Sequence, residues 1–276
     1  MLHRVWVIFI VELQKTMRLK HTLAGPFLLG ILILCAPLLH PVSRQSLGEY
    51  DQIANQGYAL IAFITPRAMG VLAFLFTLLF SAALISPELH SGNIRQIFIR
   101  PLHRYEFVIG KLLLGCSYAI LLLMTTVALS WGTAYALCHL SGSRLAGITF
   151  GGELLYTATQ MRNAYLIGFL LSMAPLFATA AFGLMISSMT RNTVQAISLA
   201  IGSWILVDAL KYPLRFDRFV FFSYLEKPWQ GFIQQCSGAD AVWFPMTWEC
   251  LAVSITTTLL CTAVAILITW RRDVSA

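Results

Sequence analysis

Apolar residues gather in six long runs along the chain, separated by more polar segments. A helix that crosses a bilayer needs about 20 mostly apolar residues, because each backbone amide must find its partner within the same segment. The pattern therefore predicts an all-α, polytopic membrane protein with six transmembrane helices in a single domain over residues 1–276. The predicted spans are residues 22–39, 68–87, 112–138, 164–189, 193–210 and 248–270.

The first 21 residues show a different pattern, with apolar side chains at helical spacing and cations elsewhere on the wheel. Such a helix lies along a membrane surface, its apolar stripe in the lipid and its cations among the headgroups. We therefore expect an interfacial helix over residues 1–21, the alternative being a polar extension of the first span. The stripe consists of Trp6, Phe9, Leu13 and Met17.

Residues 88–111 form a polar connection between the second and third predicted spans. Ile94, Ile97 and Phe98 make a short apolar face, and Pro101 ends that helix because it has no amide proton to donate. We predict a short helix within residues 88–106 on the cytoplasmic side, organised to dock against a partner. An ordinary amphipathic connector is the alternative.

The longest predicted outer segment, residues 211–247, is too aromatic for a solvated loop. Trp and Tyr concentrate at membrane–water interfaces, so this segment could contain helices that dip into the outer leaflet. An aromatic belt around the sixth span would explain the same pattern. Cys236 and Cys250, the two cysteines near this segment, could pair as a disulfide or serve as small packing residues.

The composition agrees with a membrane protein and excludes other classes. Hydrophobic residues make up 58% of the chain and charged residues 11%, less than half of the roughly 25% typical of soluble domains. The net charge of +7 comes from cations lying singly or in small groups beside the apolar runs, where they would meet lipid headgroups. We therefore expect lipid as a partner and no nucleic acid.

Lysine and arginine also indicate the orientation, since cytoplasmic segments retain them. With both termini inside, the inner segments hold eleven of the 19 basic residues in a much shorter length of chain. We expect a multi-pass protein of the bacterial inner (cytoplasmic) membrane with both termini in the cytoplasm. The eleven residues are Arg4, Lys15, Arg18, Lys20, Arg95, Arg100, Arg104, Lys111, Arg191, Arg271 and Arg272.

No motif in the sequence indicates catalysis. The GxxxxGK[ST] loop that cradles nucleotide phosphates, the GxSxG nucleophile motif and the HExxH metal motif do not occur. The predictions are no catalytic residues, no metal site and no cofactor bound by this chain. Asp208 is the carboxylate closest to a span interior, and Lys211 three residues later favours an interfacial ion pair over a substrate or proton contact.

Small polar residues inside the spans are candidates for a weakly polar transport route. The alternative is helix packing, in which hydroxyls bond the carbonyl one turn earlier. The candidates are Thr77, Ser81, Gln195, Ser198, Gly202 and Asp208. Ser254, Thr258 and Thr262 share the same pattern in the sixth span.

Residues 88–111 resemble the first cytoplasmic loop of type-2 ATP-binding-cassette (ABC) transporter permeases. That loop carries an acidic residue, a glycine, an Arg-Pro turn and a later basic-acidic-Gly-Lys pattern. The corresponding residues are Glu88, Gly92, Arg100, Pro101, Arg104, Glu106, Gly110 and Lys111, and SSMTRNTVQA at 187–196 and WRRDV at 270–274 extend the likeness. Asn93 departs from the threonine usual in the family, and the outer loops have no particular match.

The resemblance implies the membrane-spanning subunit of an ABC exporter rather than an enzyme. It implies a homodimer, or a pair with a like permease, seated on two copies of an ATPase subunit that holds ATP and Mg. The ATPase-coupling interface would comprise Glu88, His90, Ser91, Gly92, Asn93, Arg95, Gln96 and Arg100. The alternatives are a structural or assembly subunit of a membrane complex, or an ion-coupled secondary carrier.

Overall fold

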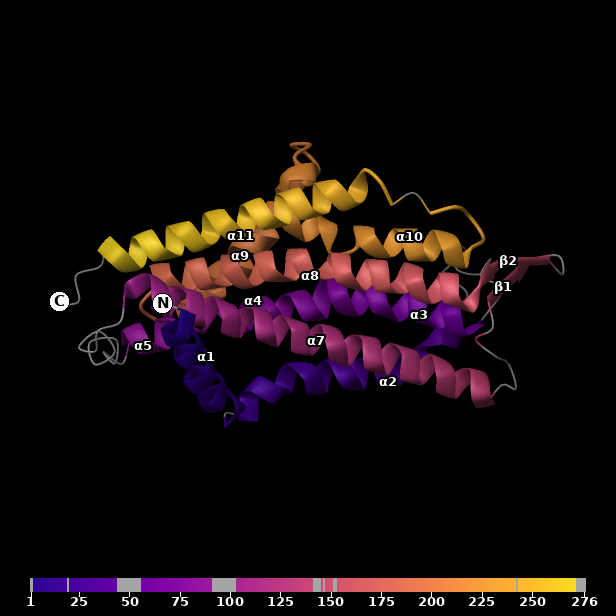
Figure 1. Cartoon of the computed structure of the whole chain (residues 1–276), viewed down its shortest axis with the longest axis horizontal. Helices are drawn as coiled ribbons and strands as arrows, with labels where there is room; N and C mark the ends of the chain where they lie inside the picture. The colour runs from indigo at the N-terminus through magenta and orange to yellow at the C-terminus, as the bar shows by residue number, and fades with distance from the viewer. Residues whose placement is uncertain are drawn as a thin grey trace.

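The structure, a computed structural model, describes residues 2–18, 20–43, 56–90, 103–140, 145, 147–150, 153–241 and 243–271. Within these ranges the fold is a long α-helical bundle with a short β-hairpin at one end (Figure 1). The principal helices are α1 (Leu2–Met17), α2 (Ala24–Ser43), α3 (Gln56–Arg67), α4 (Phe74–Ala82), α5 (Ser86–His90), α7 (Arg104–Leu140), α8 (Ala158–Met189), α9 (Thr193–Lys211), α10 (Lys227–Cys236) and α11 (Met246–Arg271). The strands β1 (Gly147–Phe150) and β2 (Glu153–Thr157) pair antiparallel.

Five helical segments of the described chain are long and apolar enough to cross a membrane, which makes this a membrane protein. They are Gly57–His90, Arg104–Leu140, Ala158–Met189, Thr193–Lys211 and Met246–Arg271. The first predicted span falls on α2, whose described apolar part, Ala24–Cys35, is shorter. Six spans thus remain a prediction, of which five have the required length and composition.

The second predicted span begins too late, because residues 56–67 already form helix α3. A π-helical segment, Ala68–Ala73, joins α3 to α4, so Gly57–His90 is almost continuous. Residues 58–64 of α3 are all apolar, but Thr65, Pro66 and Arg67 separate them from the apolar run that starts at Ala68, so the sequence does not show one continuous span here.

Helix α8 is the centre of the bundle and packs against α4, α7, α10 and α11. Small residues allow this packing: a Cβ at Gly183 would lie 3.0 Å from the Leu78 carbonyl oxygen and would collide with the Ser81 side chain on α4. Close approach of backbones is the usual way in which helices associate in lipid, where apolar contact supplies no net drive.

Much of the segment 211–247, which was predicted to lie on the outer side, packs against the helical bundle. Trp229 and Phe232 of α10 are fully buried and contact the Tyr165 ring of α8, with centroid separations of 5.2 and 5.4 Å. Re-entry of this segment into lipid stays a prediction, but the aromatic side chains of α10 are buried against α8. Cys236 and Cys250 are both buried and free, so the disulfide alternative is wrong and the packing alternative describes them.

The ends of the bundle differ. The beginning of α1, helix α5 and the end of α11 lie at one end, and the hairpin lies at the other (Figure 1). Helix α1 runs obliquely and turns through a 3-10 segment, Lys20–Leu23, into α2. The elbow formed by α1, this turn and α2 closes one side of the α5 end.

Candidate functional site

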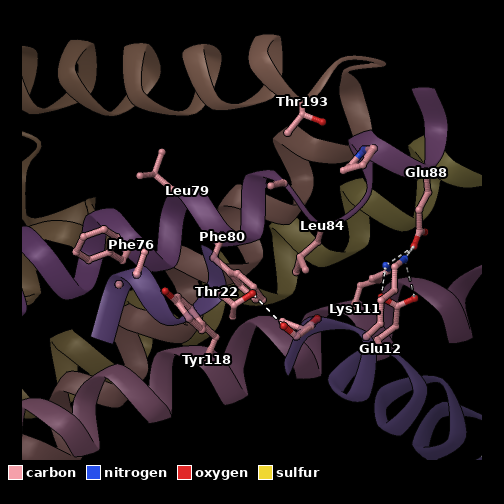
Figure 2. Close-up of a pocket in the computed structure, with 16 residues that line it drawn as sticks. Glu12, Thr22, Phe76, Leu79, Phe80, Leu84, Glu88, Lys111, Tyr118 and Thr193 are labelled. Carbon is pink, nitrogen blue, oxygen red and sulfur yellow. Dashed lines mark hydrogen bonds and ion pairs between the residues drawn. The ribbon is translucent and has the colours of Figure 1, made fainter. Parts of the chain in front are cut away.

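Four charged side chains from three helices, α1, α5 and α7, meet at the α5 end of the bundle. The Lys111 Nζ atom on α7 lies 2.7 Å from Glu12 Oε2 on α1 and 2.7 Å from Glu88 Oε1 on α5. Lys15 Nζ, one turn after Glu12, donates to the same Glu88 oxygen at 3.0 Å. We call Glu12, Lys15, Glu88 and Lys111 the charge cluster (Figure 2).

The cluster is largely removed from water. The Lys111 side chain is 2% exposed, Glu88 6% and Glu12 13%. Removing a charge from water costs several kcal/mol, and the cluster offsets this cost by bonding one ammonium to two carboxylates with a second ammonium at the rim. The cluster contains two positive and two negative charges. Its ion pairs link α1 to α5, α1 to α7 and α5 to α7, and they therefore fix the relative positions of these three helices.

Lys15 is the most accessible member, with 57% of its side chain exposed. Burial lowers the pKa of Lys15, but the hydrogen bond and charge of Glu88 and the charge of Glu12 raise it by more, and the net pKa lies above the ordinary value. Lys15 is therefore an ammonium ion at neutral pH, and its charge is available at the surface of the cluster.

The start of α7 makes further contacts through the residues that carry the family resemblance. The Glu106 carboxylate accepts the His103 amide at 3.1 Å and so caps the first turn of α7. The Arg104 guanidinium donates to the carbonyls of Thr269 and Trp270 at 3.1 and 2.6 Å, at the end of α11. The His103 amide at the start of α7 and the Thr269 and Trp270 carbonyls at the end of α11 lie at helix ends, where the helix supplies no partner, and these side chains bond them instead.

Gly110 has a packing function in the same region. A Cβ at this position would lie 2.7 Å from Cγ2 of Ile8, so only glycine lets α1 approach α7 this closely. The approach brings Glu12 and Lys111 within bonding distance. The Gly110–Lys111 pair in the sequence thus combines a close contact with an ion pair.

Helix α5 is held from its other side by α8. Pro87 cannot donate to the carbonyl of Ala83, which helps to end α4. The Ser187 hydroxyl of α8 then accepts the amides of Ile85 and Ser86, both at 3.0 Å. These amides would otherwise be buried without a partner, so Ser187 sets where the short helix begins.

The predicted coupling residues divide into two groups. Glu88 is described and is buried within the charge cluster, where it pairs with Lys111; its contact with an ATPase stays a prediction. His90 is described, exposed and at the end of α5. Ser91, Gly92, Asn93, Arg95, Gln96 and Arg100 lie outside the described residues.

The predicted route-lining residues also divide. Thr77 and Ser81 are fully buried and donate to the carbonyls of Ala73 and Thr77, both at 2.7 Å, as in the packing alternative. Gln195, Ser198 and Gly202 lie exposed on α9.

Asp208 forms an ion pair with Lys211, 2.6 Å between Oδ1 and Nζ. The Lys211 Nζ atom also lies 4.8 and 5.4 Å from the ring centroids of Tyr212 and Phe222. The three-residue spacing favours this ion pair, and the structure contains it; its position at a membrane interface stays a prediction.

A cavity of about 500 Å³ opens beside the charge cluster. Its walls come from the α1–α2 elbow, α4, α5, α7 and the first residue of α9. Apolar side chains line one end and the cluster lines the other (Figure 2).

The described part of the chain offers little for catalysis. No group of three or more His, Cys, Asp or Glu side chains gathers there in a way that could hold a metal ion. The charge cluster contains neither a nucleophile with its base nor a carboxylate pair without counterions. What it can do is hold three helices together and present one accessible cation.

Residues 45–275 match the family described as "Protein of unknown function (DUF2705)". The chain is also 26% identical over 170 residues to a protein of Bacillus subtilis (strain 168), described as "Uncharacterized protein YhcI". That match covers 55% of this chain and 50% of the relative, so it spans about half the length of each protein.

Proposed function

The chain belongs to the DUF2705 family, and we propose that it is the membrane-spanning permease subunit of an ATP-driven ABC exporter. A separate ATPase subunit, present in two copies, would bind ATP and Mg. In this proposal α2 is the first of six spans, α1 is an interfacial helix, and a second permease copy or a like permease completes the complex. The membrane is the bacterial inner membrane, with both termini and α5 on the cytoplasmic side.

The observation that carries the proposal is the position of the charge cluster relative to residues 91–102. That segment connects α5 to α7, and the Glu88–Lys111 ion pair joins α5 just before the segment to α7 seven residues after that helix begins. Because this ion pair joins α5 to α7, a force applied to the segment would displace both helices together. This arrangement suits a segment that docks on an ATPase and moves with it.

The contacts of α5 supply a path for that movement. Helix α5 follows α4 after a break at residues 83–85, and the Ser187 hydroxyl of α8 accepts the amides of Ile85 and Ser86 at the start of α5. Lys15 and Glu12 extend the connection to α1. A displacement of α5 therefore acts on the second span, on α8 and on the elbow together.

The exposed face of α9 suits an interface with a second permease copy. Gln195, Ser198 and Gly202 present small or weakly polar groups there, and a Cβ added at Gly202 would meet nothing within 4 Å. Helix α9 also contacts α5, so movement of α5 would reach this face. A central route between two copies would then have these residues along its wall.

Site-directed crosslinking tests the proposal. Single cysteines at Gly92 or Asn93 should crosslink in native membranes to a protein that carries a nucleotide-binding Walker motif. Gly132→Cys is the matched control, because Gly132 lies on α7 at a position open enough for a side chain and far along the helix from Lys111. Failure of both positions to capture an ATPase, or equal capture from Gly132→Cys, would refute the assignment and favour an assembly subunit.

A functional measurement complements the crosslinks. The chain should raise ATP hydrolysis by the captured ATPase when both are reconstituted in liposomes, and reversing the charge at Arg95 should separate hydrolysis from export without loss of membrane insertion. Normal export by an Arg95→Glu variant would contradict the coupling role of this segment.

A further inference from the structure

The cavity beside the charge cluster has the size and lining of a ligand site. Its volume of about 500 Å³ falls within the roughly 300–1,000 Å³ usual for small-molecule pockets. Phe76, Leu79 and Phe80 of α4, with Tyr118 of α7, form its apolar part. Figure 2 shows these side chains at one end and the labelled members of the charge cluster at the other.

The polar end favours an anion over a cation. Both cluster carboxylates already accept hydrogen bonds from Lys111, so a cation would compete with a bonded, buried ammonium. Lys15 is different, because its ammonium has three protons and donates one hydrogen bond, to Glu88, with Glu12 Oε1 farther away at 3.9 Å, while 57% of the side chain stays exposed. Lys15 therefore has donors available for a ligand.

A second feature at the cavity points to the same charge. Thr193, the first residue of the 19-residue helix α9, lines the cavity. The first turn of a helix carries partial positive charge from its unbonded amides, which stabilises a nearby anion. The four cluster charges that line the cavity cancel, and both carboxylates already accept hydrogen bonds from Lys111. The groups left for a ligand are therefore the remaining donors of Lys15 and the partial positive charge at the start of α9.

We propose that the cavity binds one anionic, single-chain amphiphile taken from the membrane leaflet at the α5 end of the bundle. Its carboxylate or phosphate lies at Lys15, and its hydrocarbon chain lies against Phe76, Leu79 and Phe80. The apolar walls bury the chain and Lys15 selects the headgroup. This inference concerns binding by the chain alone and does not depend on the proposed transport function.

Spin-label electron paramagnetic resonance on the purified chain in phosphatidylcholine nanodiscs tests the proposal. The probes are spin-labelled stearic acid and a quaternary-ammonium analogue with the same chain and label. The anionic probe should show an immobilised fraction roughly threefold larger than the cationic one, the selectivity expected from one solvent-accessible ion pair. Equal fractions for the two probes would overturn the proposal.

Two matched pairs of variants locate the site. Lys15→Gln should remove the preference for stearate, whereas Arg18→Gln, which removes the same charge near the end of α1 but outside the cavity lining, should keep it. Leu79→Trp should reduce the immobilised fraction by filling the cavity, whereas Leu259→Trp on the exposed face of α11 should not. Equal effects within either pair would place the probe elsewhere, as an adventitious annular lipid only.

A competition arm separates an amphiphile from a free anion. Millimolar inorganic phosphate should leave the immobilised stearate unchanged, since it has no chain to place against the apolar wall. Displacement by phosphate alone would mean that the site recognises a free anion and would overturn the assignment to a membrane amphiphile.

Discussion

Replacing Lys111 by methionine is the sharpest test of the charge cluster, because the two side chains have similar volumes and differ in charge. The substitution removes both 2.7 Å ion pairs and leaves the Glu12 and Glu88 carboxylates near one another with Lys15 alone to balance them. Removing one partner from a buried ion pair destabilises a protein by about 3–5 kcal/mol. We expect Lys111→Met to lie in this range.

Thermal unfolding of the purified chain in one detergent measures this effect. With a shift of roughly 2–4 °C per kcal/mol for a chain of this size, Lys111→Met should lower Tm by on the order of 10 °C. Lys227→Met is the matched control: its nearest carboxylate, on Asp217, is 3.8 Å away and its side chain is 28% exposed, so the loss should stay below about 1 kcal/mol.

A double-mutant cycle separates the ion pair from the loss of lysine itself. Glu88→Gln combined with Lys111→Met removes one charge of each sign and should recover part of the lost Tm, with a coupling energy of about 0.5–3 kcal/mol between the two sites. Additive losses in the double variant, or a Lys111→Met variant as stable as Lys227→Met, would refute the role of the cluster as a clamp on α1, α5 and α7.

Three further predictions concern the same end of the bundle. Ser187→Ala should cost about 1–3 kcal/mol, measured by thermal unfolding, because the Ile85 and Ser86 amides at the start of α5 lose their acceptor, and Ser187→Thr should keep most of the stability. Gly110→Val should raise proteolysis of α1, whereas Gly132→Val, which enters open space, should not; equal cleavage would exclude the proposed contact. The raised pKa of Lys15 means that its pairing with Glu88 is fully present below the unfolded pKa of 10.5 and is lost as pH rises through the folded value. Between pH 10 and 12 the Tm of the wild type should therefore fall more steeply than that of Lys15→Gln, and parallel curves would contradict this.

The long apolar runs were sufficient to predict most of the helices. Residues 164–189 and 193–210 were expected as spans, and the structure has helices Ala158–Met189 and Thr193–Lys211. The break between them could also be recognised, because Asn192 is a good N-cap and its side chain accepts the Val194 amide at 3.0 Å. Hydropathy and capping chemistry act locally, and local effects are visible in a single sequence.

The charge cluster depends on tertiary contacts, so only some of its members could be predicted from the sequence. Glu88 and Lys111 were identified through the family resemblance, but their pairing was not, since 23 residues separate them. Glu12 was missed entirely, because nothing in the local sequence distinguishes it from a solvated acidic residue on a surface helix. Its partner lies 99 residues away, and only the close contact at Gly110 brings the two together.

The same contacts that hold the cluster also define the cavity, which links the two proposals physically. Glu12, Lys15, Glu88 and Lys111 all line the cavity, and α1 forms part of its wall only while it is held against α7. A movement of α5 that lengthens the Glu88–Lys15 contact would free Lys15 for an anionic headgroup, whereas a headgroup on Lys15 would weaken its hold on α5. Ligand binding and displacement of the segment after α5 are thus linked through one ammonium group, and by thermodynamic reciprocity each must alter the other to the same degree. An anionic amphiphile should therefore change the crosslinking yield from Gly92→Cys in wild-type chain and leave it unchanged in the Lys15→Gln background.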